Sequence, residues 1–144
     1  MPAKQATNDK VFSEEERAAV QATARERKQG PGDGLNDLRE AIAKMPADDR
    51  AMAERIHEIV TTAVPTLESK TYYGMPAYAR PGKDGKVIGW FKPKSKFKVR
   101  YSTFGFQPDA SLDDGDMWGT EFAVIRLTPG VEARLVELVK KAAG

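Results

Sequence analysis

Residues 72–106 read YYGMPAYARPGKDGKVIGWFKPKSKFKVRYSTFGF. This stretch contains four short runs rich in aromatic and β-branched residues, and segments rich in Gly and Pro separate them. Such runs, punctuated by turn-forming residues, are typical of consecutive antiparallel strands. We therefore predict a β-meander over residues 69–104. Its strands are expected at residues 69–73, 77–80, 86–91 and 96–104.

The fourth of these predicted strands contains two sets of residues that alternate along the chain. One set is largely apolar and comprises Phe97, Val99, Tyr101 and Thr103. The other set is polar and mostly cationic, and comprises Lys96, Lys98, Arg100 and Ser102. A period of two predicts a strand with one buried side and one solvent-facing side. We therefore expect a row of cations on the outer face of the sheet.

Segments with helical periodicity flank the meander on both sides. A short helix that Pro46 ends is predicted by the spacing of Leu35, Leu38, Ile42 and Met45. The next helix carries Asp48 and Asp49 in its first turn, and its apolar face comprises Met52, Ile56, Ile59, Val60 and Ala63. A last helix is expected to begin at Thr128 and Pro129. Its buried face comprises Val131, Leu135, Leu138, Val139 and Ala142.

These elements together predict an α+β fold, a two-layer sandwich. Its antiparallel sheet of about five strands combines the meander 69–104 with a strand at 120–127, and is packed by N-terminal helices and a C-terminal helix. Residues 33–144 are expected to form this domain. Residues 1–32 are expected to hold a disordered tail, a helix at 13–28 with a capping box at 13–16, and a Gly/Pro linker.

Composition excludes several classes of protein. No apolar run approaches the roughly 20 residues of a membrane span, and the polar N-terminus lacks the apolar core of a signal peptide. We therefore expect a cytoplasmic protein without a membrane partner. The absence of cysteine and the single histidine, His57, exclude zinc sites of the Cys/His type. No nucleophile elbow or phosphate-binding loop is present, so we expect a protein without enzymatic activity.

The net charge of +2 conceals a separation of charges along the chain. Residues 70–101 contain nine basic residues and one acidic residue, whereas residues 102–121 contain five acidic residues and no basic one. Two interpretations are open. The acidic segment folds back and neutralises the basic sheet, or the chain presents two separate charged surfaces, one for anions and one for cations.

Two groups of carboxylates are candidate ligands for a hard cation or Fe²⁺. The first group is Glu14, Glu15 and Glu16, and the second is Asp113, Asp114 and Asp116. A capping role explains the first group without a metal. A solvated turn explains the second, which lacks the ligand spacing of a calcium loop.

Five cations form a candidate anion-binding row, and they are Lys92, Lys94, Lys96, Lys98 and Arg100. Aromatic residues are interleaved with them, and single-stranded nucleic acid is held by cations beside aromatic rings. The alternation instead favours aromatic side chains in the core, and lysines on an edge strand also protect a sheet from aggregation. Because the row of cations is present, nucleic acid stays an alternative partner.

The hexapeptide Tyr-Gly-Met-Pro-Ala-Tyr at residues 73–78, preceded by a helix containing Ile56, Ile59 and Val60, resembles the YdhG-like family, also called domain of unknown function 1801. The similarity extends over about residues 35–142. It implies an α+β sandwich of the YjbR/CyaY-like group, similar in shape to frataxin. It also implies a role as an intracellular iron chaperone that delivers Fe to an iron-accepting protein.

A second interpretation of the hexapeptide is the rim of a small-ligand pocket with one cation for an anionic group. The lining residues would be Tyr73, Gly74, Met75, Pro76, Tyr78, Trp90, Arg100 and Tyr101. The alternative is a strand-to-strand corner whose tyrosines pack on the preceding helix. We therefore expect a non-catalytic binding protein, monomeric or dimeric. Iron carriage, anion or nucleic-acid binding, and small-ligand binding are its candidate functions.

Overall fold

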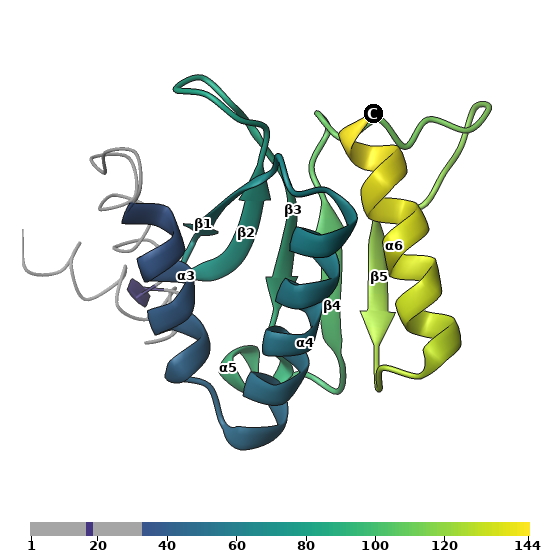
Figure 1. Ribbon diagram of the computed structural model, residues 1–144. Helices are drawn as coiled ribbons and strands as arrows, with labels where there is room; N and C mark the ends of the chain where they lie inside the picture. Colours follow the sequence, from purple (N-terminus) through teal and green to yellow (C-terminus); the bar gives the residue numbers. More distant parts are fainter. Residues whose placement is uncertain (1–16, 19–32) are drawn as a thin grey trace, which may run out of the picture.

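The computed structural model describes residues 17–18 and 33–144, and its centre is a five-stranded antiparallel sheet. The strands are β1 Glu68–Tyr72, β2 Met75–Ala79, β3 Val87–Lys92, β4 Ser102–Phe106 and β5 Glu121–Val124. Their order in the sheet follows their order in the sequence (Figure 1). The predicted meander and the α+β class are therefore confirmed.

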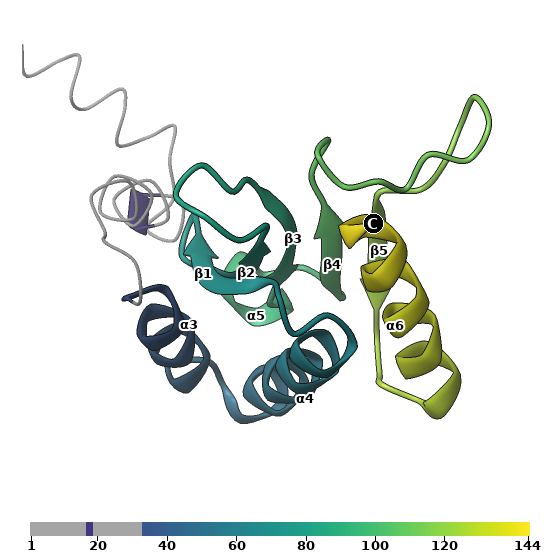
Figure 2. The same ribbon diagram turned by 45° about the horizontal axis from the view of Figure 1, so that its top comes forward.

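Three helices lie along one face of this sheet (Figure 2). They are α3 Asp33–Ala43, α4 Ala47–Ala63 and α6 Pro129–Ala143. Arg17 and Ala18 are also helical. The predicted tail, the remainder of the helix expected at 13–28 and the Gly/Pro linker lie outside the described residues.

The core lies between the helices and the facing side of the sheet. Each helix contributes the apolar stripe that its spacing predicts, and the sheet contributes large aromatic rings. The most buried of these side chains include Leu38, Ile56, Val60, Tyr78, Phe91, Phe104 and Val139. The last helix begins as predicted, since the Thr128 Oγ1 accepts the Val131 N–H at 3.2 Å and Pro129 occupies the first turn.

The first hairpin turns more tightly than its sequence indicates. Tyr72 pairs with Met75, so the turn consists of Tyr73 and Gly74 alone, with φ angles of 51° and 79°. Two positive φ angles define a type I′ turn, whose twist matches that of the flanking strands. Pro76, expected at a corner, lies inside β2 and pairs with Thr71 of β1.

The predicted strand at residues 96–104 is wrong over its first half. Residues Lys94–Phe97 form a short helix, α5, which ends at Lys98 in the left-handed region with φ 54°. The first strand residue is Ser102. The N–H groups that open this helix find acceptors inside the fold, because Lys94 donates to Ser102 Oγ at 3.0 Å and Ser95 donates to Asp49 Oδ2 at 3.1 Å. The expected row of outward cations on one strand is therefore absent from the described residues.

The other face of the sheet carries a small second cluster centred on Trp90. Its indole lies against Gly105 of the neighbouring strand, and Met75 and Ala77 are buried beside it. The indole N–H donates to Gln107 Oε1 at 2.9 Å. The Gln107 amide in turn donates to the Tyr72 hydroxyl at 3.1 Å. The buried polar atoms of this cluster are thus paired.

The contact between Trp90 and Gly105 gives a first prediction. A Cβ atom on residue 105 would overlap Cζ2 and Cη2 of the indole. We expect Gly105→Ala to lower the free energy of unfolding by about 1–3 kcal/mol, because the ring must leave its position. Urea unfolding followed by circular dichroism measures this change.

Gly130→Ala is the matched control for this substitution. A Cβ atom at residue 130 meets nothing within 4 Å, and the residue lies in the first turn of α6. We expect no loss of stability and a gain of up to about 1 kcal/mol, because alanine favours the helix. Equal stability of the two variants would contradict the proposed role of the indole contact.

Candidate ligand-binding site

A cavity of about 470 Å³ lies where α3, the start of α4, the first hairpin and α5 meet. Its lining comprises Ala18, Asp37, Glu40, Ala41, Lys44, Met45, Pro46, Asp49, Thr71, Gly74, Pro93, Ser95 and Lys96. A volume of this size lies in the range typical of sites for small organic molecules. The residues come from five separate segments, so the cavity is a product of the folded chain.

Two buried polar side chains line the inner part of the cavity. Asp49 is 2% exposed and Thr71 is 6% exposed. Asp49 lies in the first turn of α4, where a carboxylate is favoured by the helix dipole. One of its oxygens accepts the Ser95 N–H, which holds α5 against the cavity. The buried carboxylate therefore both shapes this wall and presents a hydrogen-bond acceptor to the interior.

Charged side chains of both signs line the outer part. Asp37 and Glu40 lie three residues apart on one side of α3, and Lys44 directly follows the helix. Lys96 lies on α5. The apolar part of the lining consists of Ala41, Met45, Pro46 and Pro93. This mixture suits a small organic molecule that carries an ionic group.

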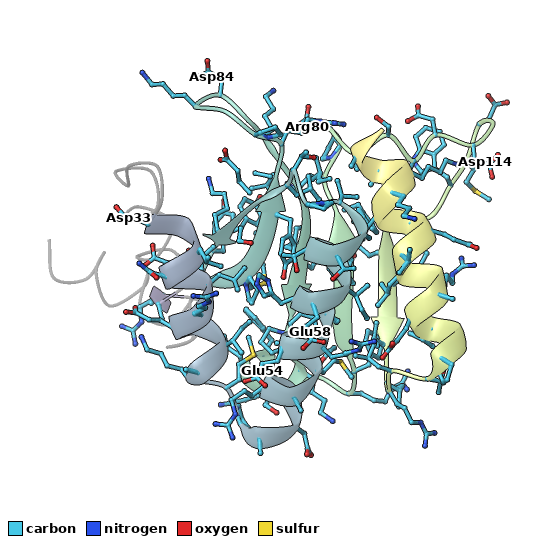
Figure 3. All side chains as sticks on the ribbon, in the orientation of Figure 1. Asp33, Glu54, Glu58, Arg80, Asp84 and Asp114 are labelled. Carbon is cyan, nitrogen blue, oxygen red and sulfur yellow. The ribbon has the colours of Figure 1, made fainter. Side chains whose placement is uncertain are left out.

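A second hollow, of about 490 Å³, lies over the connection between β2 and β3. Residues 80–86 and Asp109 line it, and most of them are exposed. Figure 3 shows Asp84 at the outermost part of this connection. The hollow therefore lacks the enclosed, partly apolar walls of the first cavity, which we take as the candidate site.

The eight residues predicted to line a pocket are not gathered in one place. Gly74 lines the cavity, whereas Tyr73 lies in the exposed turn. Met75 and Trp90 belong to the cluster on the other face of the sheet, and Pro76 is buried. Arg100 lies over the ring of Tyr101 at 5.1 Å, beyond α5.

Tyr78, the remaining residue of the predicted pocket, packs against α4. Its side chain is 1% exposed, and its hydroxyl lies 3.0 Å from Nδ1 of His57. The interpretation in which the tyrosines of the hexapeptide pack on the preceding helix therefore describes Tyr78. Burial raises the pKa of the Tyr78 phenol. The phenol thus keeps its proton, and the tautomer of His57 decides which of the two groups donates in this hydrogen bond.

The five predicted anion-binding cations do not form a row on one strand. Lys92 and Lys96 lie over the ring of Phe97, at 4.9 and 5.7 Å from its centre. Lys94 opens α5 and Lys98 ends it. Only Lys96 of the five lines the cavity.

The candidate metal ligands do not form a site within the described residues. Glu14, Glu15 and Glu16 lie outside them. Asp113, Asp114 and Asp116 are exposed on the connection between β4 and β5, and Figure 3 shows Asp114 at its far end. In residues 17–18 and 33–144, no group of three or more His, Asp or Glu side chains is arranged to hold a metal ion.

Sequence reasoning missed most residues of the cavity. Asp49 and Asp48 are identical neighbours in the sequence, and only the fold distinguishes the buried one from the exposed one. Lys44 and Thr71 carry no motif. The available signal was the presence of two adjacent aspartates at the start of a helix with an apolar face, which indicates that one of them points inward.

Comparisons of the chain with protein-family models, with curated proteins and with solved structures return no match. The resemblance to the YdhG-like family therefore stays a prediction. The longest described helix, α4 with 17 residues, and the other described helices fall short of the length and apolarity of a membrane span.

The buried carboxylate gives a second prediction. Asp49→Ala removes the acceptor of the Ser95 N–H, and the loss of this part-buried hydrogen bond should lower the free energy of unfolding by about 1 kcal/mol. We also expect faster hydrogen exchange at the Ser95 amide, measured by NMR. Asp48→Ala is the matched control, because Asp48 is exposed. A similar effect of both substitutions would mean that Asp49 acts only through the helix dipole.

The histidine gives a third prediction. Burial, and next the positive charge of Arg39, lower the pKa of His57 below its ordinary value of 6.5. The unfolded chain therefore binds a proton at a higher pH than the folded chain. The contribution of His57 to stability should be complete above pH 6.5 and should be lost as the pH falls through the lowered pKa.

Urea unfolding between pH 5 and 8 measures the free energy of unfolding as a function of pH. In the variant His57→Gln, the part of the decrease at low pH that comes from His57 should be absent. Tyr78→Phe is the control, because it removes the hydrogen bond and keeps the half-buried imidazole. If His57→Gln keeps the full pH dependence of the wild type, the decrease comes from another group.

Proposed function

We propose that this chain is a non-catalytic binding protein of the YdhG-like type that holds a small organic ligand in the cavity between α3 and α5. The observation that carries this proposal is the cavity itself, about 470 Å³ in volume, whose lining combines a buried carboxylate with charged side chains of both signs. Apolar walls with a few placed polar groups are the usual form of a small-molecule site.

The charges of the lining indicate the class of ligand. Lys44 and Lys96 favour an anionic group on the ligand, and Asp49 favours a hydrogen-bond donor. The apolar walls favour a hydrocarbon or aromatic body between these two ends. We therefore propose a small zwitterionic or amphiphilic molecule with an anionic group at one end and an N–H donor at the other.

Iron carriage is the role that the family resemblance implies. Within the described residues, the candidate acidic ligands do not form a metal-binding geometry. Asp113, Asp114 and Asp116 would need further ligands from outside the described residues. Anaerobic titration of ¹⁵N-labelled protein with Fe²⁺ tests the role. Saturable changes confined to these amides, or to those of Glu14, Glu15 and Glu16, would support it. The absence of any localised change would rule it out.

The ligand class gives a fourth prediction. We expect 4-(aminomethyl)benzoate, which carries a carboxylate, an ammonium group and an aromatic ring, to shift the amide signals of Thr71, Gly74 and Ser95 saturably. Benzoate and benzylamine each carry half of this chemistry and should bind more weakly. Two-dimensional NMR titration of the ¹⁵N-labelled full chain measures all three affinities.

The double variant Lys44→Glu/Lys96→Glu should weaken binding of the zwitterion by roughly tenfold or more, since a charged hydrogen bond contributes about 1.5–3 kcal/mol. Lys83→Glu/Lys86→Glu is the matched control, because it changes the net charge equally on exposed residues away from the cavity. Equal weakening in both variants would show that only the overall charge matters. Shifts scattered over the surface would contradict the cavity as the site.

A further inference from the structure

Two groups of oppositely charged residues lie at opposite ends of β4 and β5. We define the basic end as Lys98, Val99, Arg100, Ile125 and Arg126, and the acidic loop as Asp113, Asp114, Asp116, Met117 and Trp118. Residues 98–101 lead into the start of β4, whereas residues 107–120 leave its other end. Figure 1 shows the acidic loop extending beyond the top of the sheet, with α5 near the bottom.

The acidic segment meets part of the basic segment, because the Arg80 guanidinium donates to the Asp109 carbonyl oxygen at 2.9 Å and to Ser111 Oγ at 3.4 Å. Lys86 also reaches the acidic segment, with its Nζ 4.0 Å from Oδ1 of Asp109. In the described part of the chain, no ion pair joins Lys92, Lys94 or Arg100 to an acid of residues 109–121. The acidic segment therefore contacts the basic segment at Arg80 and Lys86, whereas the cations that precede β4 lie at the other end of the strands.

Each of the two ends also exposes large apolar side chains. In the acidic loop, Met117 is 88% exposed and Trp118 is 39% exposed. At the basic end, Val99 is 45% exposed and Ile125 is 61% exposed. Single exposed apolar residues are ordinary, but Met and Trp beside charges, at a protruding position, have the composition of a protein–protein contact.

The residues of the basic end are brought together by the strand register. Ser102 pairs with Val124 in the antiparallel ladder between β4 and β5. The residues that precede Ser102 and those that follow Val124 therefore leave the sheet side by side. This places Arg100 and Arg126 at one end of neighbouring strands, with Val99 and Ile125 close to them.

We propose that the partner of each end is the opposite end of a second copy of this chain. The acidic loop and the basic end are complementary in charge, and both contain exposed apolar side chains that an interface would cover. Because they lie at opposite ends of the same strands, one molecule presents its loop to the next along the strand direction. Such a contact is heterologous, so it joins more than two copies in a closed ring or an open filament.

The association should depend strongly on salt. The charges of both ends are exposed, and the Debye length falls from about 10 Å at 0.1 M to about 3 Å at 1 M ionic strength. We expect sedimentation velocity of the full chain to show species larger than a dimer as the protein concentration rises at low salt. The apparent affinity should fall by roughly tenfold or more in about 1 M NaCl.

Two charge-reversal variants test the pairing of the two ends. Asp114→Lys/Asp116→Lys disables the acidic loop, and Arg100→Glu/Arg126→Glu disables the basic end. Each variant alone should remain monomeric, because both of its possible contacts then join like charges. An equimolar mixture should form a complex, because the first variant retains a basic end and the second retains an acidic loop. Circular dichroism checks that both variants are folded.

Several outcomes would overturn this proposal. A wild-type chain that stays monomeric at low salt would remove it, and growth that stops at a dimer would contradict the head-to-tail geometry. If the two charge-reversal variants associate as the wild type does, the contact between copies lies elsewhere on the surface. None of these substitutions alters Lys44, Asp49 or Lys96, so the result is independent of ligand binding in the cavity.

Discussion

The hydrogen bond from the Ser95 N–H to the buried Asp49 carboxylate determines the path of the chain between β3 and β4. Without an acceptor at this point, the amide would have to face water or pair with a neighbouring strand. With it, the chain turns into α5, and the Lys94 N–H finds the Ser102 hydroxyl at the start of the next strand. The same turn forms one wall of the cavity. It also places Lys98 and Arg100, which follow α5, outside the strands of the sheet. A single buried acceptor thus links the candidate site to the placement of charge.

Helix α4 carries this constraint to the rest of the fold. Asp49 in its first turn meets α5, and His57 two turns later meets the hydroxyl of Tyr78 in the centre of the sheet. On its exposed side, the Arg55 guanidinium donates to both carboxylate oxygens of Glu132 on α6, at 3.0 and 2.7 Å. That ion pair lowers the pKa of Glu132, but it is exposed and contributes mainly to alignment. The two part-buried polar contacts therefore join the same face of α4 to α5 and to the sheet.

Local periodicity predicted the helices and most of the strands because their apolar faces are continuous in the sequence. Leu38 and Ile42 mark α3, and the aromatic runs mark the sheet. The same reasoning failed at residues 96–101, where a regular alternation of cations and apolar residues belongs to a short helix and a turn. The deciding acceptor, Asp49, lies 46 residues earlier, and no local pattern contains it. The cavity was missed for the same reason, since its lining is assembled from five separate segments.

The open face of the sheet explains why an aromatic and basic segment does not serve as a stacking surface for bases. Trp90 is 8% exposed, because one side of its ring covers Gly105 and its N–H is bound to Gln107. The ring of Phe97 is in turn covered by the ammonium groups of Lys92 and Lys96. Aromatic faces that are already occupied have little area to offer to a base. The side chains that retain exposed area lie instead around the cavity and at the two ends of the strands, and binding by this chain is therefore expected there.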